Sequence, residues 1–203
     1  MSGRGPSARR PRGRAPATPT RGALRVVAGS LRGRRLDVPA GSSTRPTSDR
    51  VRQALFNALE SLGAVEGAQV VDPFAGSGAL GIEALSRGAA HATFADDDPA
   101  ALAVVRANVE GLGLAPRARI VGGRGTGVVA AGAGWDLVLL DPPYAFDGWP
   151  ELLGAVASTL APDGLVVVES DRDVPLPGEL VGVRTKAYGG TVVQFARRSG
   201  ATS

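Results

Sequence analysis

The sequence predicts an α/β fold in which a mostly parallel sheet is covered by helices on both faces. From residue 68 onward, short apolar runs typical of buried strands alternate with longer segments of helical periodicity. This alternation is characteristic of strand–helix–strand units, whose strands lie parallel. Two final strand-like runs, joined by residues 188–190 (Tyr-Gly-Gly), predict a closing antiparallel hairpin. The 203 residues, 43% of them hydrophobic, suffice for one domain and a tail.

The start of the chain is expected to lie outside this sheet. Residues 1–21 are rich in Gly, Pro, Ser and Arg, and we expect a disordered basic tail there. Residues 22–43 are expected to form a β-hairpin extension, because the loose alternation over residues 24–38 is interrupted by Gly29 and Gly33.

The main domain, residues 44–203, is expected to begin with a turn and a helix. Ser48 or Asp49 is placed to cap this helix, which runs to about Leu62. Strands are then expected at residues 69–72, 92–95, 118–121, 136–140 and 164–169, with the closing pair at 180–187 and 191–197. Further helices are expected at about residues 78–88, 98–111, 125–132 and 149–160.

Positive charge is concentrated at the start of the chain. Residues 1–36 contain ten arginines and no acid, whereas the remainder is net negative, since the whole chain carries only +4. A basic arm on an acidic body is typical of proteins that bind polyanions, so nucleic acid is the expected partner. Arginine is also favoured over lysine throughout, with Lys186 as the single lysine, so part of this bias reflects composition.

Composition excludes several classes of site. The chain has no cysteine, and His91 is its one histidine, so thiolate metal sites, disulfides and a Ser–His triad are not expected, and neither is a bound metal. No apolar run approaches the ~18 residues of a membrane span, and the basic start lacks the apolar stretch of a secretory signal. We expect a cytoplasmic monomer without membrane contact.

A glycine turn follows the first strand expected in the sheet. This glycine motif, residues 72–78, reads Asp72-Pro73-Phe74-Ala75-Gly76-Ser77-Gly78, and its last three residues begin a G-x-G-x-x-G pattern that ends at Gly81. Asp96 follows Gly76 at the roughly twenty-residue spacing of a carboxylate that binds a ribose diol. The pattern alone fits both a nicotinamide dinucleotide and S-adenosylmethionine.

Asp72 distinguishes these two cofactors. A dinucleotide places its pyrophosphate against such a turn, where the Asp72 carboxylate would repel it by about 4 kcal/mol per charge pair at about 4 Å and an effective dielectric of about 20. S-adenosylmethionine carries an ammonium and a sulfonium, which the same carboxylate attracts. The sign of the interaction therefore favours S-adenosylmethionine.

Three carboxylates follow the second strand of the sheet. Asp96 is expected to bind the ribose diol, and Asp97 is a further cofactor candidate, although we expect it to be solvated. Asp98 precedes Pro99 and is expected to cap the next helix, with the proline in its first turn.

A second motif, Asp141-Pro142-Pro143-Tyr144, follows another apolar run. Because ligands bind at the carboxyl ends of parallel strands, Asp141 is expected beside the glycine motif. The Asp141 carboxylate and the Pro142 carbonyl can accept hydrogen bonds from both hydrogens of a base amine, which favours the localised lone pair that attacks a methyl group. Pro143 helps to hold the loop rigid, and Tyr144 can stack on the base. The alternative is a capped turn with an incidental tyrosine.

The glycine motif and the D-P-P-Y motif together resemble class I methyltransferases that act on exocyclic amines. A third segment narrows the resemblance. Residues 25–36 (RVVAGSLRGRRL) and 44–57 (TRPTSDRVRQALFN), with the Tyr-Gly-Gly hairpin, are similar to the RsmD-type bacterial 16S rRNA (guanine-N2)-methyltransferases. The resemblance covers about residues 23–198.

The resemblance implies a seven-stranded class I, Rossmann-like methyltransferase fold with an N-terminal hairpin. It implies S-adenosylmethionine as cofactor and, as substrate, a guanine amine of small-subunit ribosomal RNA in an assembled particle. It also implies that the segment Arg45–Arg50 closes over the cofactor, with Thr47 or Arg50 meeting its carboxylate. For Arg45 and Arg50, phosphate contact or simple solvation remain alternatives.

The chain departs from the family after the third strand, where such enzymes usually carry an acid that faces the adenine amine. Here residues 122–125 read Gly-Gly-Arg-Gly, so a backbone group is a possible substitute for the acid. Two other functions remain open. One is a DNA adenine-N6 or cytosine-N4 methyltransferase, which the small size disfavours. The other is an RNA-binding protein with a vestigial methyltransferase domain, which the intact motifs disfavour.

Overall fold

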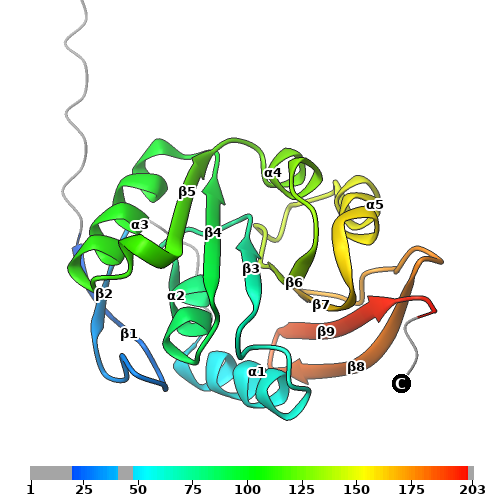
Figure 1. The fold of residues 1–203 in the computed structure, drawn as a ribbon, viewed down its shortest axis with the longest axis horizontal. Coiled ribbons are helices and arrows are strands. Elements are labelled where there is room, and N and C mark those ends of the chain that lie inside the picture. Colours follow the sequence, from blue (N-terminus) through cyan, green and yellow to red (C-terminus); the bar gives the residue numbers. More distant parts are fainter. Residues whose placement is uncertain (1–19, 41–47, 201–203) are drawn as a thin grey trace, which may run out of the picture.

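The computed structural model describes residues 20–40 and 48–200, with residues 20–23 described by their backbone alone. Seven strands form one sheet in the order β5-β4-β3-β6-β7-β9-β8, and β1 and β2 form a separate antiparallel pair (Figure 1). The sheet strands are β3 (Gln69–Asp72), β4 (His91–Asp96), β5 (Ala118–Gly122), β6 (Trp135–Leu140), β7 (Leu160–Ser170), β8 (Leu180–Tyr188) and β9 (Thr191–Arg198). Strands β5, β4, β3, β6 and β7 are parallel, whereas β9 is antiparallel to both β7 and β8.

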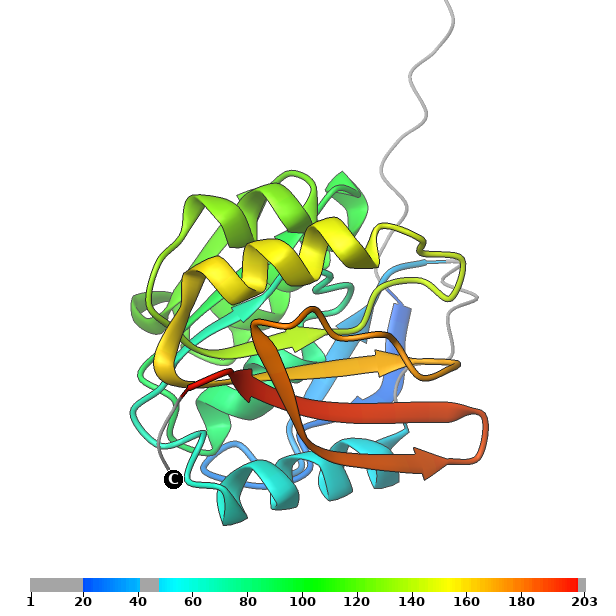
Figure 2. The same cartoon turned by 90° about the vertical axis from the view of Figure 1, so that its right-hand side faces the viewer.

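The helices cover both faces of the sheet, as the alternation of elements predicts. They are α1 (Asp49–Ser61), α2 (Ala79–Ser86), α3 (Pro99–Gly111), α4 (Gly125–Ala131) and α5 (Trp149–Thr159), with a short 3-10 helix at Ala115–Arg117. Buried side chains of α1, α2 and α3 belong to one apolar cluster, and those of α4 and α5 to another. In Figure 2, α5 lies above the sheet and α1 below it. The predicted α/β class is confirmed.

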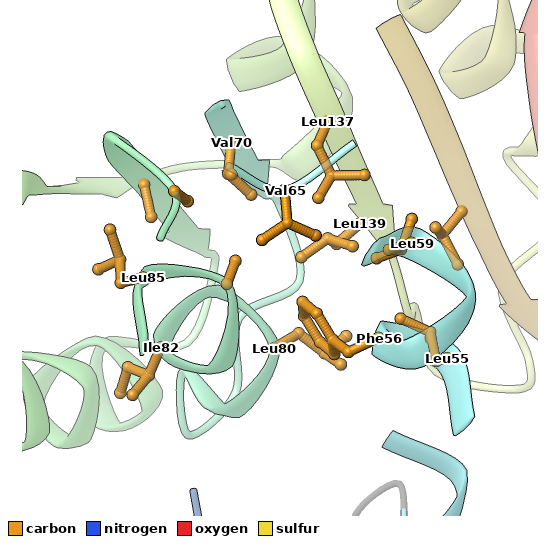
Figure 3. Packing of buried hydrophobic residues seen from close by; sticks show 14 of the residues in the cluster. Leu55, Phe56, Leu59, Val65, Val70, Leu80, Ile82, Leu85, Leu137 and Leu139 are labelled. Atoms are coloured by element: carbon orange, nitrogen blue, oxygen red, sulfur yellow. The ribbon is translucent and has the colours of Figure 1, made fainter. Parts of the chain in front are cut away.

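The larger apolar cluster fixes where α1 and α2 lie on the sheet. Phe56 and Leu59 of α1 are fully buried and lie near Leu80 of α2 and Leu139 of β6 (Figure 3). Burial of one such side chain contributes roughly 1.5–3 kcal/mol. This packing holds the N-terminus of α2, and with it the glycine motif, against the ends of the central strands.

The hairpin formed by β1 (Thr20–Arg25) and β2 (Arg35–Val38) is attached to the main domain through α2. The buried carboxylate of Glu83 accepts hydrogen bonds from the backbone N–H groups of Val27 and Ala28, at 2.7 and 2.9 Å. Ser86 Oγ accepts from the Leu31 N–H at 3.0 Å. A buried carboxylate needs such partners, and Arg87 Nε, 2.8 Å from Glu83, supplies the compensating charge.

Most element boundaries agree with the sequence expectation to within one or two residues, and Ser48 caps α1 as predicted, accepting from the Val51 N–H. Two strands are longer than expected. Strand β1 includes Thr20 and Arg21, which composition places in the tail, because they pair with β2. Strand β7 begins at Leu160, which pairs with Trp135 of β6. The register between β6 and β7 shifts directly after this pair, so the Pro-Asp-Gly segment, residues 162–164, forms a bulge at the start of β7.

The third glycine of the G-x-G-x-x-G pattern sets the spacing between α2 and β4. A Cβ on Gly81 would lie 2.3 Å from Phe94 Cε1, a distance that forces the helix and strand apart. We expect Gly81→Ala to lower the free energy of unfolding by about 1–3 kcal/mol, measured by denaturant titration. Gly127→Ala, in α4, is the matched control, because beyond the neighbouring backbone of its own helix no described atom lies within 4 Å of the added Cβ, and it should be neutral or slightly stabilising. Equal effects of the two substitutions would contradict this role for Gly81.

None of the helices within the described ranges is long and apolar enough to cross a membrane.

Candidate active site

The two sequence motifs meet at the carboxyl ends of two neighbouring parallel strands. Val70 and Val71 of β3 pair with Leu137 and Val138 of β6, so the loops that follow both strands leave the same edge of the sheet. The loops also touch, because the Phe74 and Phe146 rings pack edge to face with centroids 5.4 Å apart. The fold therefore brings the glycine motif and the D-P-P-Y motif together.

Asp72, the last residue of β3, is a buried carboxylate with one satisfied oxygen. Its Oδ2 accepts a hydrogen bond from the Gly81 N–H at 3.0 Å, whereas Oδ1 has no hydrogen-bond partner among the described residues. Burial raises the pKa of Asp72 to about 7, the Gly81 hydrogen bond opposes this shift, and the negative charges of Asp141 and Asp96 add to it.

The environment of Asp72 suits a cation. A buried carboxylate oxygen without a donor is costly, and an ammonium group supplies both a donor and a compensating charge. The pyrophosphate of a dinucleotide would instead add negative charge beside three carboxylates. The residues present therefore fit the methionine ammonium of S-adenosylmethionine, and Asp72 is the residue that would hold it.

The rest of the glycine motif is held in a tight turn. Gly76 and Gly78 have φ values of 54° and 81°, in the left-handed region that favours glycine. The Ala75 N–H donates to the Ala95 carbonyl at 2.9 Å, and the Gly76 N–H donates to Asp96 Oδ2 at 2.9 Å. Within this turn Pro73 is buried and Ser77 is half-buried, so the backbone presents a fixed surface to a ligand.

Asp96 ends β4 and is half-buried beside this turn. Its second oxygen accepts from the Asp98 N–H at 2.9 Å, and a carboxylate with two such bonds retains acceptor sites for a ribose diol. Asp98 caps α3 as predicted, since its side chain accepts from the Ala100 N–H. Asp97 is exposed to solvent.

The D-P-P-Y motif forms a turn whose two ends differ in exposure. Asp141 is half-buried at the end of β6 and Pro142 is buried, whereas the following residues are exposed. The Phe146 N–H donates to the Pro143 carbonyl at 2.8 Å, which closes the turn. Tyr144 is 56% exposed, so its ring is open to a base that approaches from solvent.

Two further candidates for the cofactor site lie at the start of α1 and in the segment before it. Arg50 is exposed in the first turn of α1, and Thr47 lies outside the described residues, as does Arg45. At the family departure, Arg124 is exposed and its side chain makes no hydrogen bond in capping α4. The neighbouring Gly125 lies close to the glycine motif, because a Cβ there would be 2.6 Å from the Pro73 carbonyl oxygen.

Sequence reasoning missed three residues near these loops. Asn108 of α3 is buried, and its side chain binds both the backbone of Asp37 in β2 and the Ser77 carbonyl in the glycine motif, the latter at 2.9 Å. Its signal was a polar residue within the apolar stripe of a helix. Phe146 joins the two loops, and Glu169 is a buried carboxylate at the end of β7, next to β6. An acid at the end of an apolar run was the available signal for Glu169.

Comparison with known proteins agrees with this geometry. The family model described as "Conserved hypothetical protein 95" matches residues 24–197. "Ribosomal RNA small subunit methyltransferase D" of Escherichia coli K12 is 40% identical over 159 residues, 77% of this chain and 79% of that protein. The protein of the same name in Haemophilus influenzae is 33% identical over 162 residues, 77% of this chain and 83% of that protein.

Solved structures share the fold. The Escherichia coli protein yhhF superposes with a TM-score of 0.77 at 36% identity and covers 86% of this chain and 97% of its own. The Thermus protein TTHA0928 gives a TM-score of 0.72 at 32% identity and covers 86% of this chain and 99% of its own. The fold, the two motifs and the family match all indicate the same family. The chain belongs to the RsmD-type family of class I methyltransferases.

Proposed function

We propose that this protein transfers a methyl group from S-adenosylmethionine to the exocyclic N2 amine of a guanine in 16S ribosomal RNA, within an assembled small-subunit particle. The observation that carries this proposal is the buried, unsatisfied Asp72 Oδ1 next to the D-P-P-Y loop. It pairs a site for a cationic cofactor with a site for a flat base amine. The names of the relatives support ribosomal RNA as the substrate.

S-adenosylmethionine, when bound, supplies a methyl group on a sulfonium, ready for displacement. Asp72 would hold the ammonium, Asp96 would hold the ribose diol, and the glycine turn would shield the methionine portion from water. Asp141 and the Pro142 carbonyl accept the two amine hydrogens of the base, and Tyr144 stacks on its ring. By positioning the amine, these residues would supply much of the acceleration, and the Asp141 carboxylate would accept the proton that the amine loses.

Thr47, Arg50 and Asp97 complete the proposed cofactor site. Arg50 is the second residue of α1 and is exposed, so its guanidinium is a candidate partner for the cofactor carboxylate. Asp97 follows Asp96 and is exposed, which suits a water-mediated contact at the outer side of the ribose.

Mapping of methylated nucleosides tests the function. Purified protein and labelled S-adenosylmethionine are incubated in parallel with small-subunit particles, naked 16S RNA and duplex DNA, and the products are digested and identified by mass spectrometry. We expect N2-methylguanosine at one position, with the particle as the best substrate. Methylated adenine or cytosine in DNA would instead support the DNA methyltransferase alternative, and RNA binding without methylation would support a vestigial domain.

A further inference from the structure

A basic hollow lies between the N-terminal hairpin and α3. It has a volume of about 410 Å³, and its lining includes Arg34 and Arg35 of the hairpin and Asn108 and Gly111 of α3. Both arginines are exposed to solvent. Asp37 is the acidic residue of the lining, so the two guanidinium groups leave the hollow net positive.

Backbone hydrogen bonds and strand pairing hold both arginines in the hairpin, where Arg35 pairs with Arg25 of β1. The Arg34 backbone is bonded on both sides, since its carbonyl accepts from the Val26 N–H at 2.9 Å and its N–H donates to the Leu31 carbonyl at 3.0 Å. The Arg34 side chain is also oriented, because Nη2 donates to the Gly111 carbonyl at 3.2 Å. A guanidinium has five N–H donors, so this bond leaves others directed to solvent.

The hollow is connected to the cofactor site through one buried side chain. Asn108 Oδ1 accepts from the Asp37 N–H at 2.8 Å, and Asn108 Nδ2 donates to the carbonyls of Asp37 and Ser77 at 3.0 and 2.9 Å. The same side chain therefore fixes both β2 and the glycine motif. A ligand bound by Arg34 and Arg35 would therefore lie at a defined position relative to the candidate methyl-donor site.

We propose that this hollow is a binding site for backbone phosphates of the RNA substrate, on the strand that flanks the target nucleotide, and we call it the phosphate site. The inference rests on the proposed function and adds to it where the substrate is anchored. A guanidinium group matches the charge and the hydrogen-bonding geometry of phosphate oxygens, and the hollow carries two of them, with the Arg34 side chain oriented by its bond to Gly111. Contacts of this kind position a nucleic acid without reading its sequence. The phosphate site therefore sets the position of the RNA on the protein, whereas the D-P-P-Y loop selects the base.

The test compares particle binding by the wild type and by the double variant Arg34→Gln/Arg35→Gln over about 50–200 mM salt, together with methylation kinetics. Loss of two phosphate contacts should reduce the log–log salt slope by roughly 1.4–1.8 and weaken particle binding about tenfold at 150 mM salt. In the methylation kinetics of the double variant, we expect the KM for the particle to rise and the KM for the cofactor to stay unchanged. Arg34→Lys/Arg35→Lys, which keeps the charge, should restore the slope.

The matched control is Arg184→Gln/Lys186→Gln, which removes the same charge from exposed positions on β8, at the other end of the sheet. An unchanged salt slope of particle binding in the Arg34/Arg35 variant, or an equal loss of affinity in the β8 control, would contradict the proposed phosphate site. If the double variant is less stable to heat than the wild type, Arg35→Gln alone carries the same comparison with half the slope change. Failure of the wild type to methylate any RNA particle would instead overturn the proposed function.

Discussion

Replacing Asp141 with alanine is expected to reduce the single-turnover rate of methyl transfer by about 100- to 1,000-fold at saturating cofactor. The amine of a base is a weak nucleophile because its lone pair is delocalised into the ring, and a carboxylate acceptor favours the localised form. Loss of one such preorganised group typically costs this much in rate. Affinity for S-adenosylmethionine should stay within a few-fold, because Asp72 and Asp96 remain. Rapid-quench methylation and calorimetry measure the two quantities.

Asp147→Ala is the matched control for this substitution. Asp147 lies in the same loop, is exposed, and carries the same charge. We expect it to leave the single-turnover rate close to that of the wild type. A near-normal rate for Asp141→Ala would show that this carboxylate is not the amine acceptor, and an equal loss for Asp147→Ala would point to net charge as the cause.

Affinity for S-adenosylmethionine is expected to rise with pH between about 5.5 and 7.5 and then to level off. Burial raises the pKa of Asp72 to about 7, so the free protein holds a proton there in acidic solution. The proposed contact with the cofactor ammonium requires the ionised carboxylate, so binding would have to displace this proton, at a cost of up to tenfold in affinity per pH unit below the pKa. Calorimetry over the pH series measures the effect.

Asp72→Asn should remove this pH dependence and weaken binding by about 1–3 kcal/mol at pH 7.5, since a charged hydrogen bond is lost. Asp163→Asn, at an exposed position near the start of β7, is the control and should retain the wild-type profile. A profile in Asp72→Asn that matches the wild type would assign the titration to another group. Tight binding of NAD in place of S-adenosylmethionine would overturn the role of Asp72 altogether.

The same group affects stability in the opposite direction. The pKa of Asp72 is higher in the folded protein, at about 7, than the ordinary value of 3.8 for an aspartate. Between these pH values the folded state holds a proton that the unfolded chain has released, so the contribution of Asp72 to the free energy of unfolding falls as the pH rises. Without cofactor at pH 8, Asp72→Asn should therefore melt at a higher temperature than the wild type, although it binds the cofactor less well.

The sequence by itself determined the fold class and the order of its elements. Apolar runs and helical periodicity are local, and each element from β3 to β9 carries its own pattern, so the strands and helices could be placed within a few residues. The rule that parallel strands present ligands at their carboxyl ends then predicted that Asp72 and Asp141 would meet. The structure shows the adjacent strands and the touching loops that this rule requires.

Only the tertiary structure decided how these parts are held in place. The bonds from Asn108 to Ser77 and Asp37, the attachment of the hairpin to Glu83, and the contact of Phe74 with Phe146 join residues that are distant in sequence. Hydrogen bonds and ring packing depend on distances of a few ångströms, and one sequence does not specify which distant groups come that close. The protonation of Asp72 depends on the same information, because its pKa follows from burial and from the carboxylates that the fold places around it.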